Sequence, residues 1–404
     1  MSSPLGRAVE RVVQNGNCSG CGGCTLVSGD VSMELRGDGW MRPRVQDAGA
    51  SGREEAQIFK KICPGVVMTR ADRGMRRDHA TFGSYITSWR AQAADPEVRE
   101  NGSSAGVLTA LSQFLVETGH AETVAAAGAN PAAPTRTVPV RIQSRAEALA
   151  AGGSRYAPVS VLAGAPSSGP VGAVSGKPCE ISAMRRFSEL AGGEAQTPFL
   201  LSFFCAGTPS QRATNALITK LGVDPSEATS LRYRGNGWPG RFSAESPKSS
   251  GSLSYEDSWG KHLGRDLQWR CKICPDGTGE DADVAVGDFW EADELGYPVF
   301  EETQGSSVAI ARTERGQTLL LAAAEAGYLV LEEVSLDDVA RIQPLQVNRK
   351  QTLAARLAAR VIAGNRIPNY RGYGMVARAI RDPRTSAKAF ARTFVKARVR
   401  GANQ

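Results

Sequence analysis

The eight cysteines constrain this chain more than any other feature, because they fall into two sets of four with none left over. The first set comprises Cys18, Cys21 and Cys24, spaced C-x-x-C-x-x-C, and Cys63, which is followed by Pro64. The second set comprises Cys179, Cys205, Cys271 and Cys274, of which the last two are spaced C-x-x-C. Four converging thiolates form the ligand shell of an iron–sulfur cluster, and a C-x-x-C turn delivers two of them to one side of the metal centre. The pattern predicts two 4Fe-4S clusters and a role in electron transfer.

Zinc is the alternative metal for both sets, because it also accepts four thiolates. The first set resembles half of a bacterial ferredoxin, in which C-x-x-C-x-x-C wraps one edge of a cluster and a distant C-P closes the shell. This spacing suits a cluster better than tetrahedral zinc, which usually takes two C-x-x-C pairs. For the second set, the alternative is two buried structural cysteines, Cys179 and Cys205, beside an unrelated zinc knuckle. On that interpretation the chain is a zinc-stabilised binding protein.

The composition excludes several other classes of protein. A chain of 404 residues, of which 41% are hydrophobic, can bury a large core in two or more domains. No apolar run approaches the length that spans a membrane. The segment 1–14 lacks the apolar core of a signal peptide, so we expect a cytoplasmic protein. Thiols in that reducing compartment bind metals more often than they form disulfides. With only three histidines, histidine-based metal or triad chemistry is not expected.

The order of apolar runs predicts a mixed α/β fold in three parts. Residues 1–70 are expected to form a small, loop-rich, ferredoxin-like module, followed by a linker over 70–79. Residues 80–345 alternate strand and helix signals, which favours a mainly parallel sheet covered by helices. Strands are expected at 123–127, 171–174, 198–204, 283–286 and 307–312, and helices at 107–118, 179–190 and 317–326. A loop rich in glycine and aromatic residues covers 232–241, and a basic helical tail covers 349–404.

Two cysteines of the second set, Cys179 and Cys205, are expected where a strand passes into a helix. In a parallel sheet such positions share the edge at which ligands usually bind, so residues far apart in the sequence can converge there. A helix N-terminus also favours the thiolate form that binds iron. Cys271 and Cys274 would complete the shell from a loop.

A second candidate site is the run of small residues from Asn101 to Gly106, which opens the helix at Val107. Free backbone N–H groups at a helix N-terminus can hold a pyrophosphate. The alternative is an ordinary serine cap, and the sequence does not choose between the two.

The tail carries the positive charge of the chain, with 14 Lys and Arg from Arg349 onward against one acid, Asp382. We favour a solvated helical appendage. The alternatives are contact with an anionic membrane surface or with an acidic protein partner. Nucleic acid is not expected, because the tail has few aromatic residues for stacking and no recognised binding motif.

Several segments together resemble the coenzyme F420 hydrogenase/dehydrogenase beta-subunit family, in its bacterial branch, which is also similar to 7-hydroxymethyl chlorophyll a reductase. They run in family order over roughly residues 15–330. The matching segments are CSGCGGC at 18–24, NGSSAGVLTAL at 101–111, GSRY at 153–156, GKPCEISAMRR at 176–186, RYRGNGWPG at 232–240, CKICPDGTGEDADVAVGDFW at 271–290 and SSVAIARTERG at 306–316.

The resemblance implies an FAD-containing iron–sulfur oxidoreductase that acts on a small organic substrate or on coenzyme F420 or a similar deazaflavin. An electron-donor protein such as a ferredoxin is a candidate partner. The alternative is a non-catalytic electron-transfer subunit that feeds a partner enzyme, for which some relatives suggest polysaccharide biosynthesis. No catalytic residue follows from the motifs.

The resemblance also assigns residues around the flavin. It places Ser103, Ser104 and Gly106 beside FAD, with Gly237, Trp238 and Asp288 as further pocket candidates. Two departures from the family pattern stand out. Ala105 replaces a glycine, which bears on how closely FAD can approach the backbone. The family's GTPCQ is here GKPCE, so Lys177 and Glu180 alter the charge beside Cys179.

Overall fold

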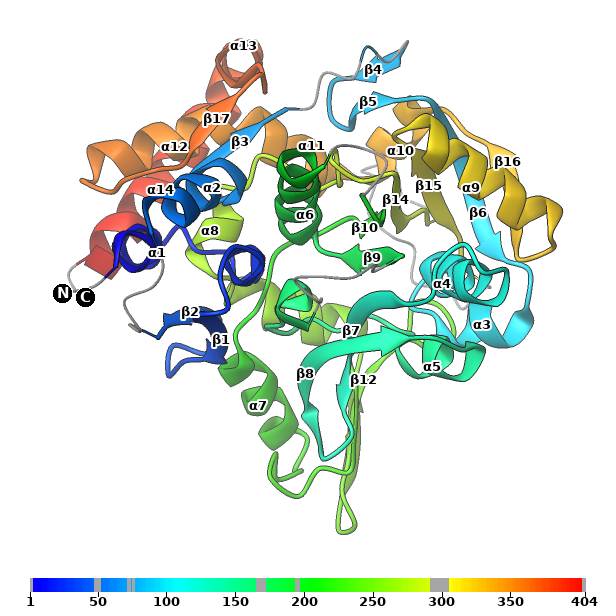
Figure 1. The fold of residues 1–404 in the computed structure, drawn as a ribbon. Coiled ribbons are helices and arrows are strands. Elements are labelled where there is room, and N and C mark those ends of the chain that lie inside the picture. The colour runs from blue at the N-terminus through cyan, green and yellow to red at the C-terminus, as the bar shows by residue number, and fades with distance from the viewer. Residues whose placement is uncertain are drawn as a thin grey trace.

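The computed structural model describes residues 3–46, 52–70, 74, 77–164, 172–192, 197–290 and 305–401. Its centre is a mixed sheet of eight strands (Figure 1). In spatial order these are β16 (Leu329–Glu333), β6 (Thr87–Ala93), β15 (Ser307–Ala311), β14 (Val284–Asp288), β10 (Phe199–Phe203), β9 (Ala173–Gly176), β7 (Val124–Asn130) and β8 (Ala133–Ile142).

The four central strands β14, β10, β9 and β7 run parallel, which confirms the predicted parallel arrangement where the candidate site lies. The strands on both flanks pair antiparallel. The expected strands at 123–127, 198–204, 283–286 and 307–312 appear as β7, β10, β14 and β15. The strand expected at 171–174 appears as β9, although Val171 itself lies outside the described residues, as do 71–73 and 75–76 of the expected linker.

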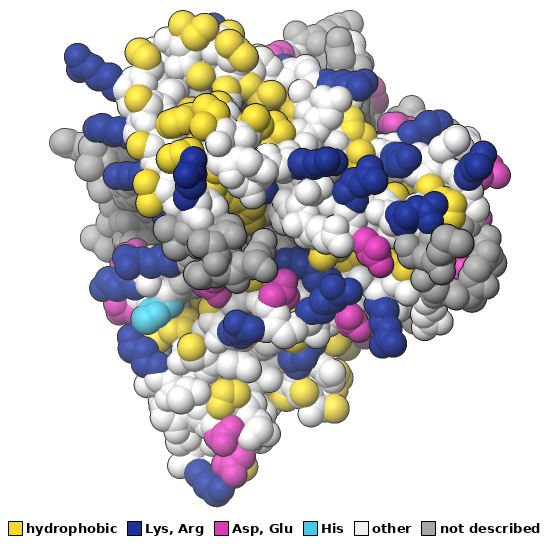
Figure 2. Space-filling view, turned by 90° about the vertical axis from the view of Figure 1, so that its left-hand side faces the viewer, with side chains coloured by type: hydrophobic (Ala, Val, Ile, Leu, Met, Phe, Trp, Pro, Cys, Tyr) yellow, Lys and Arg dark blue, Asp and Glu magenta, His cyan; other side chains and the backbone are white. Residues whose placement is uncertain are grey.

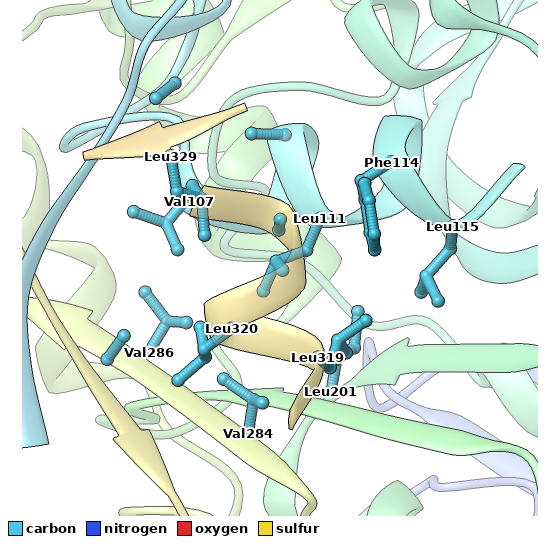
Figure 3. Packing of buried hydrophobic residues seen from close by; sticks show 14 of the residues in the cluster. Val107, Leu111, Phe114, Leu115, Leu201, Val284, Val286, Leu319, Leu320 and Leu329 are labelled. Carbon is cyan, nitrogen blue, oxygen red and sulfur yellow. The ribbon is translucent and has the colours of Figure 1, made fainter. Parts of the chain in front are cut away.

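Side chains alternate between the two faces of the sheet, as strand geometry requires. Leu201, Val284 and Val286 point to the face covered by α4 (Val107–Glu117) and α9 (Glu314–Glu325), whose packing Figure 3 shows. The neighbouring Leu200 and Ala285 point to the opposite face, against α6 (Pro178–Ala191). Central strands buried on both faces are typical of parallel sheets covered by helices.

Further elements complete this part of the fold. They are β4 (Arg77–His79), β5 (Gly83–Tyr85), α3 (Pro96–Asn101), α5 (Arg145–Ala150), η2 (Val161–Gly164), α7 (Gln211–Lys220), β11 (Ser230–Arg232), β12 (Phe242–Glu245), β13 (Ser250–Leu253), η4 (Glu256–Gly260), η5 (Leu263–Arg265), α8 (Trp269–Lys272) and α10 (Leu336–Ile342). Strands β11, β12 and β13 form a separate antiparallel sheet. The loop predicted at 232–241 joins β11 to β12.

The N-terminal segment forms a small unit beside the main sheet (Figure 1). It consists of α1 (Pro4–Gln14), η1 (Gly23–Leu26), β1 (Val31–Leu35), β2 (Met41–Val45), α2 (Arg53–Ile62) and β3 (Val67–Thr69). Leu5, Val9 and Phe59 form its own core, against which Cys18, Cys24 and Cys63 pack.

The tail consists of α11 (Pro344–Gln351), α12 (Leu353–Ile362), β17 (Asn369–Arg371), α13 (Met375–Arg381) and α14 (Pro383–Gly401). The interpretation of a solvated appendage is wrong for its first part. β17 pairs with β3 of the N-terminal unit, and Leu353, Leu357 and Tyr370 share a buried cluster with Met68 and Ile273. The division into three units stays a prediction, and α11 runs across its boundary at residue 349.

Within the described part of the chain, no helix is both long and apolar enough to cross a membrane.

Candidate cofactor site

The cysteines of the first set come together in the N-terminal unit. Cys18 and Cys21 lie in the loop after α1, Cys24 lies in η1, and Cys63 caps the end of α2. All four line one small cavity of about 20 Å³ between α1, α2 and the hairpin β1–β2. Glycines let the loop turn tightly here, because Gly20 and Gly22 have φ of 69° and 79°, which L-residues with a Cβ rarely adopt.

The pKa values of these thiols report how closely they lie. Burial raises the pKa of Cys24 well above its ordinary value, and the sulfurs of Cys21, Cys18 and Cys63 raise it further. Burial also raises the pKa of Cys63, and Cys21 and Cys18 add to the effect. Several neighbouring sulfurs that disfavour one another as thiolates are the donor set that a cationic metal centre would stabilise.

The cysteines of the second set converge from three elements. Cys179 is the second residue of α6, Cys205 follows β10, and Cys271 and Cys274 lie in and after α8. Because β9 and β10 are parallel neighbours, the residues after their carboxyl ends share one edge of the sheet. Burial raises the pKa of Cys205 to about 12, with the sulfurs of Cys271 and Cys274 adding to the effect.

As expected, Cys205 is separated by a turn from the next helix, α7, which starts at Gln211. Cys179 lies in the first turn of α6, and burial raises the pKa of its thiol. The backbone supplies polar contacts. The Thr208 N–H donates to Cys271 Sγ at 3.4 Å, and Cys274 Sγ donates to the Asp276 carbonyl at 3.0 Å.

The two sets are neighbours in space. After burial, the sulfur of Cys21 in the first set is the strongest influence that raises the pKa of Cys179 in the second. Arg270 interacts with both sets. Its charge lowers the pKa of Cys63, and its own pKa is raised by Tyr370 first and then by Cys274, Cys179 and Cys271. Its guanidinium is buried and donates to the Pro64 carbonyl at 3.0 Å. One buried cation therefore serves both groups of sulfurs.

The spacing of the side chains bears on the choice of metal. Among the described residues, no group of three or more Cys, His, Asp and Glu is arranged to hold a single metal ion. A zinc ion bound by four thiolates remains the alternative to a cluster at each set. An iron–sulfur cluster, which lies between its four cysteines, fits the donor set, and this assignment stays a prediction.

A cavity of about 850 Å³ opens beside the second set. Its wall includes Cys205, the loop that opens α4, and the carboxyl ends of β9, β10 and β14. Of the residues predicted to lie by the flavin, Ser103, Ser104, Gly106 and Asp288 line it. Gly237 and Trp238 are not among the lining residues. Trp238 instead lies behind the wall, where its ring stacks on that of Trp290 at 6.2 Å.

The loop before α4 is not closed by a serine cap, which decides against that alternative. Ser103 Oγ bonds Ser154 Oγ at 2.6 Å, and Ser104 Oγ donates to the Ser306 carbonyl at 2.8 Å. The cap position is Gly106, with φ of 70° and no side-chain hydrogen bond. The first turn of α4 therefore presents backbone N–H groups and the positive end of a helix dipole at the cavity, which suits an anionic group.

Ala105 does not obstruct this loop. Its side chain is fully buried in the hydrophobic core, and the cavity is lined by its neighbours Ser104 and Gly106 rather than by Ala105. The glycine that matters is Gly106, since a Cβ there would lie 2.5 Å from the Val98 carbonyl oxygen. The replacement of the family's glycine by Ala105 is therefore compatible with a ligand beside the loop.

Lys177 and Glu180 form a buried ion pair between the cavity and Cys179. Lys177 Nζ lies 2.6 Å from Glu180 Oε1, and the two side chains are 8% and 0% exposed. Lys177 Nζ also donates to the Val159 carbonyl at 2.9 Å. Glu180 accepts from the N–H groups of Val161 and Lys177. The two departures from the family pattern thus compensate each other's charge.

Sequence reasoning missed a second polar group in the cavity wall. Arg234 is buried and pairs with Asp288 at 2.7 Å. Its guanidinium lies over the rings of Trp238 and Tyr255, at 4.5 and 5.0 Å. Despite burial, Asp288 raises the pKa of Arg234. The run RYRGNGWPG at 232–240 was a signal for this group, because it joins an arginine to aromatic residues in a shaped loop.

Comparisons with known proteins agree on one family. The model described as "Coenzyme F420 hydrogenase/dehydrogenase, beta subunit N-term" matches residues 88–164. Its companion model, which describes the C-terminal part of the same beta subunit, matches residues 172–337. The chain belongs to this family. The two matched regions contain the cavity loop, the central strands and the whole second cysteine set, whereas the N-terminal unit and the whole tail lie outside them.

Two curated relatives and one solved structure are similar to this family member. The coenzyme F420 hydrogenase subunit beta of Methanococcus voltae is 26% identical over 71% of this chain and 99% of that protein. The coenzyme F420-dependent sulfite reductase of Methanocaldococcus jannaschii is 23% identical over 84% of this chain, which spans about 50% of that protein. A chain of the F420-reducing [NiFe] hydrogenase complex from Methanosarcina barkeri has a TM-score of 0.50 at 20% identity. The similarity covers 68% of this chain and 96% of the hydrogenase chain, and it supports the fold.

Proposed function

We propose that this chain is an iron–sulfur flavoprotein oxidoreductase that passes electrons between two 4Fe-4S clusters and FAD. Cys18, Cys21, Cys24 and Cys63 hold the first cluster, and Cys179, Cys205, Cys271 and Cys274 hold the second. FAD occupies the cavity beside the second set. The observation that carries the proposal is that Cys205 and the loop Ser103–Gly106 line the same cavity.

In this proposal, the positions of the cysteine sets determine the order in which electrons pass between the redox centres. The first set lies in the N-terminal unit, the second lies at the sheet edge, and Cys21 and Cys179 bring them close together. The second set in turn borders the cavity through Cys205. A bound flavin supplies the exchange between single electrons and electron pairs. The protein's part is to fix the distances and to exclude water.

The side chains around the cavity have distinct roles in this proposal. The first turn of α4 binds the pyrophosphate through its N–H groups. Ser103 and Ser104 hold the loop in place through their bonds to Ser154 and Ser306. Lys177, fixed by Glu180, places one cationic amine between the cavity and Cys179. Arg234 and Asp288 form an ion pair that lines another part of the cavity wall.

The names of the relatives favour oxidoreductase chemistry and coenzyme F420 as a substrate. One relative is named a hydrogenase subunit and the other an F420-dependent sulfite reductase. We therefore propose a small organic acceptor or an F420-like deazaflavin as the substrate, with a ferredoxin-like donor as a candidate partner.

The second candidate function is an electron-transfer subunit that performs no turnover alone. It is favoured by the relative from Methanococcus voltae, because the similarity covers 99% of that protein and the protein is named as a subunit. Turnover of reduced F420 with an artificial acceptor by the isolated chain would decide for the enzyme. Failure of every acceptor to turn over, with clusters that still reduce and reoxidise, would decide for the subunit.

The first test is metal, sulfide and flavin analysis of protein purified without oxygen. The proposal expects brown protein with four irons in each cysteine set and extractable FAD. Colourless protein that contains zinc, and takes up neither iron nor flavin on reconstitution, would overturn it in favour of a zinc-stabilised binding protein.

A further inference from the structure

The tail presents a surface that the redox site does not use. Of the ten large hydrophobic residues that are exposed in the described chain, five lie in helices α12, α13 and α14 of the tail: Val361, Ile362, Val376, Ile380 and Val395. They are between 53% and 70% exposed. Figure 2, which faces the side of the molecule where Figure 1 places α12 and α14, shows hydrophobic side chains gathered in its upper part with Lys and Arg around them.

Helix α14 carries a basic strip beside part of this apolar surface. Arg384, Lys388, Arg392 and Lys396 are spaced four residues apart and are exposed. This spacing places them along one side of a helix. Ala387, Ala391 and Val395 form a parallel exposed strip next to them. The opposite side of α14, with buried Ser386 and Ala397, packs on α12.

Carboxylates of the described residues balance these positive charges only weakly, through the interaction of Lys388 with Asp382, whose pKa it helps to lower after the bonds from Thr385. None of the four basic residues forms an ion pair with a described carboxylate. The tail's one acid, Asp382, is used locally, since it accepts from the Thr385 N–H at 3.0 Å at the start of α14. Arg378, by contrast, is held by the Tyr373 carbonyl at 3.1 Å and belongs to the fold rather than to the surface.

We propose that this tail surface, formed by α12, α13 and α14, binds peripherally to a membrane that contains anionic lipids. A helix with Lys and Arg beside exposed aliphatic side chains has the chemistry of an interfacial helix. The basic residues meet the headgroups, and the aliphatic side chains enter the boundary with the acyl chains. A protein partner is less well matched, because protein interfaces are enriched in aromatic anchors, whereas the large apolar residues exposed on this surface are Val and Ile.

The test is co-sedimentation of the full chain with vesicles of phosphatidylcholine alone or mixed with phosphatidylglycerol, at low and high salt. We expect binding to the anionic vesicles only, and loss of most of it at high salt. Lys388→Gln with Arg392→Gln should weaken binding about fivefold for each residue neutralised. The matched control, Arg141→Gln with Arg241→Gln, removes the same charge from exposed positions on β8 and before β12 and should bind like the parent.

A second pair of variants tests the apolar part. Val376→Ser with Ile380→Ser should weaken binding severalfold, because less apolar surface leaves water, whereas Val330→Ser on β16 should not. The substituted valines and isoleucine are at least 50% exposed, and the substituted basic residues are also exposed. An iron content equal to that of the parent would show that the fold of each variant is intact. Equal binding to both kinds of vesicle, or binding to neither, would overturn the proposal. So would retention on poly-L-glutamate or duplex DNA without vesicle binding.

Discussion

The two cysteine sets each gather four thiols, but they do so by different routes. The first is almost local: three of its members lie within seven residues, and the small unit of α1, α2 and the β1–β2 hairpin brings in the fourth. The second is assembled by the topology of the main sheet from residues spread over positions 179–274. A local set depends on a turn, whereas a distributed set depends on everything that fixes its elements against one another. The second set should therefore respond to many more substitutions than the first.

The largest expected effect comes from the ligands themselves. Cys271→Ser should lose the second cluster and keep the first, and Cys63→Ser should do the reverse, because a serine hydroxyl is a poor replacement for a thiolate. Iron and sulfide content, together with the spectra of the reduced protein, would measure this. If Cys271→Ser lost neither cluster, the assignment of the second set would be wrong.

Breaking the ion pair beside Cys179 comes next. Lys177→Met should cost about 3–5 kcal/mol in the free energy of unfolding, because it leaves Glu180 buried without its cation. The double variant Lys177→Thr/Glu180→Gln, which restores the family pattern, should cost much less. Denaturant unfolding of both variants is the measurement. A double variant as unstable as Lys177→Met would show that the pair's charges do not compensate each other.

Asp283 fixes elements that carry the second cysteine set, and its contribution to stability should depend on pH. Its carboxylate holds β10 through the Leu200 N–H and α6 through Arg185, both at 2.7–2.8 Å. Burial alone would raise its pKa, but Arg185 and Arg315 lower it below its ordinary 3.8. The stabilisation is therefore present above about pH 4 and is lost as the pH falls toward the lowered value.

Asp283→Asn should accordingly cost about 3 kcal/mol near neutral pH, and the difference from the parent should shrink below pH 4. Unfolding measured across this pH range checks the sign. Asp257→Asn is the control, because Asp257 is paired with Lys261 on the surface and lies away from the cysteines. A difference that grows as the pH falls would contradict the assigned role.

The smallest effect is expected at Tyr370. Its hydroxyl donates to the Ile273 carbonyl at 2.9 Å, between Cys271 and Cys274. Tyr370→Phe should cost about 1 kcal/mol and speed the loss of iron from the second cluster to a chelator, with the first cluster unchanged. Tyr328→Phe removes an exposed bond to Glu117 and should leave both rates as they are.

The sequence predicted the parts of the fold that repeat a local pattern. Apolar runs and spacing located α4, α6, β10 and β14, and the parallel order of β9 and β10 followed from the alternation of strand and helix. From that order came the convergence of Cys179 and Cys205. The loop Ser103–Gly106 was also found, although only the structure shows that its serines bond elsewhere and leave the helix terminus open.

The helices of the tail were predicted, but the packing of its first part against the rest of the molecule could not be, for a physical reason. Its basic residues look solvated in the sequence, because their partners are backbone carbonyls or distant acids. Arg349 donates to the carbonyl of Cys205, 144 residues away, and Lys350 pairs with Glu280 at a separation of 70 residues. Every residue has a backbone carbonyl, so the sequence does not indicate which carbonyl accepts a hydrogen bond from an arginine. An arginine that binds a carbonyl therefore cannot be distinguished in the sequence from one that is solvated.

The position of α11 and β17 has a consequence for how the protein is made. Residues 344–373 leave the ribosome after both cysteine sets, and they then close over the loops of Cys205 and Cys271 through Arg349 and Tyr370. Under the proposed assignment, iron and sulfide would reach the second set before this late segment folds over its loops, or afterwards through the cavity that Cys205 lines.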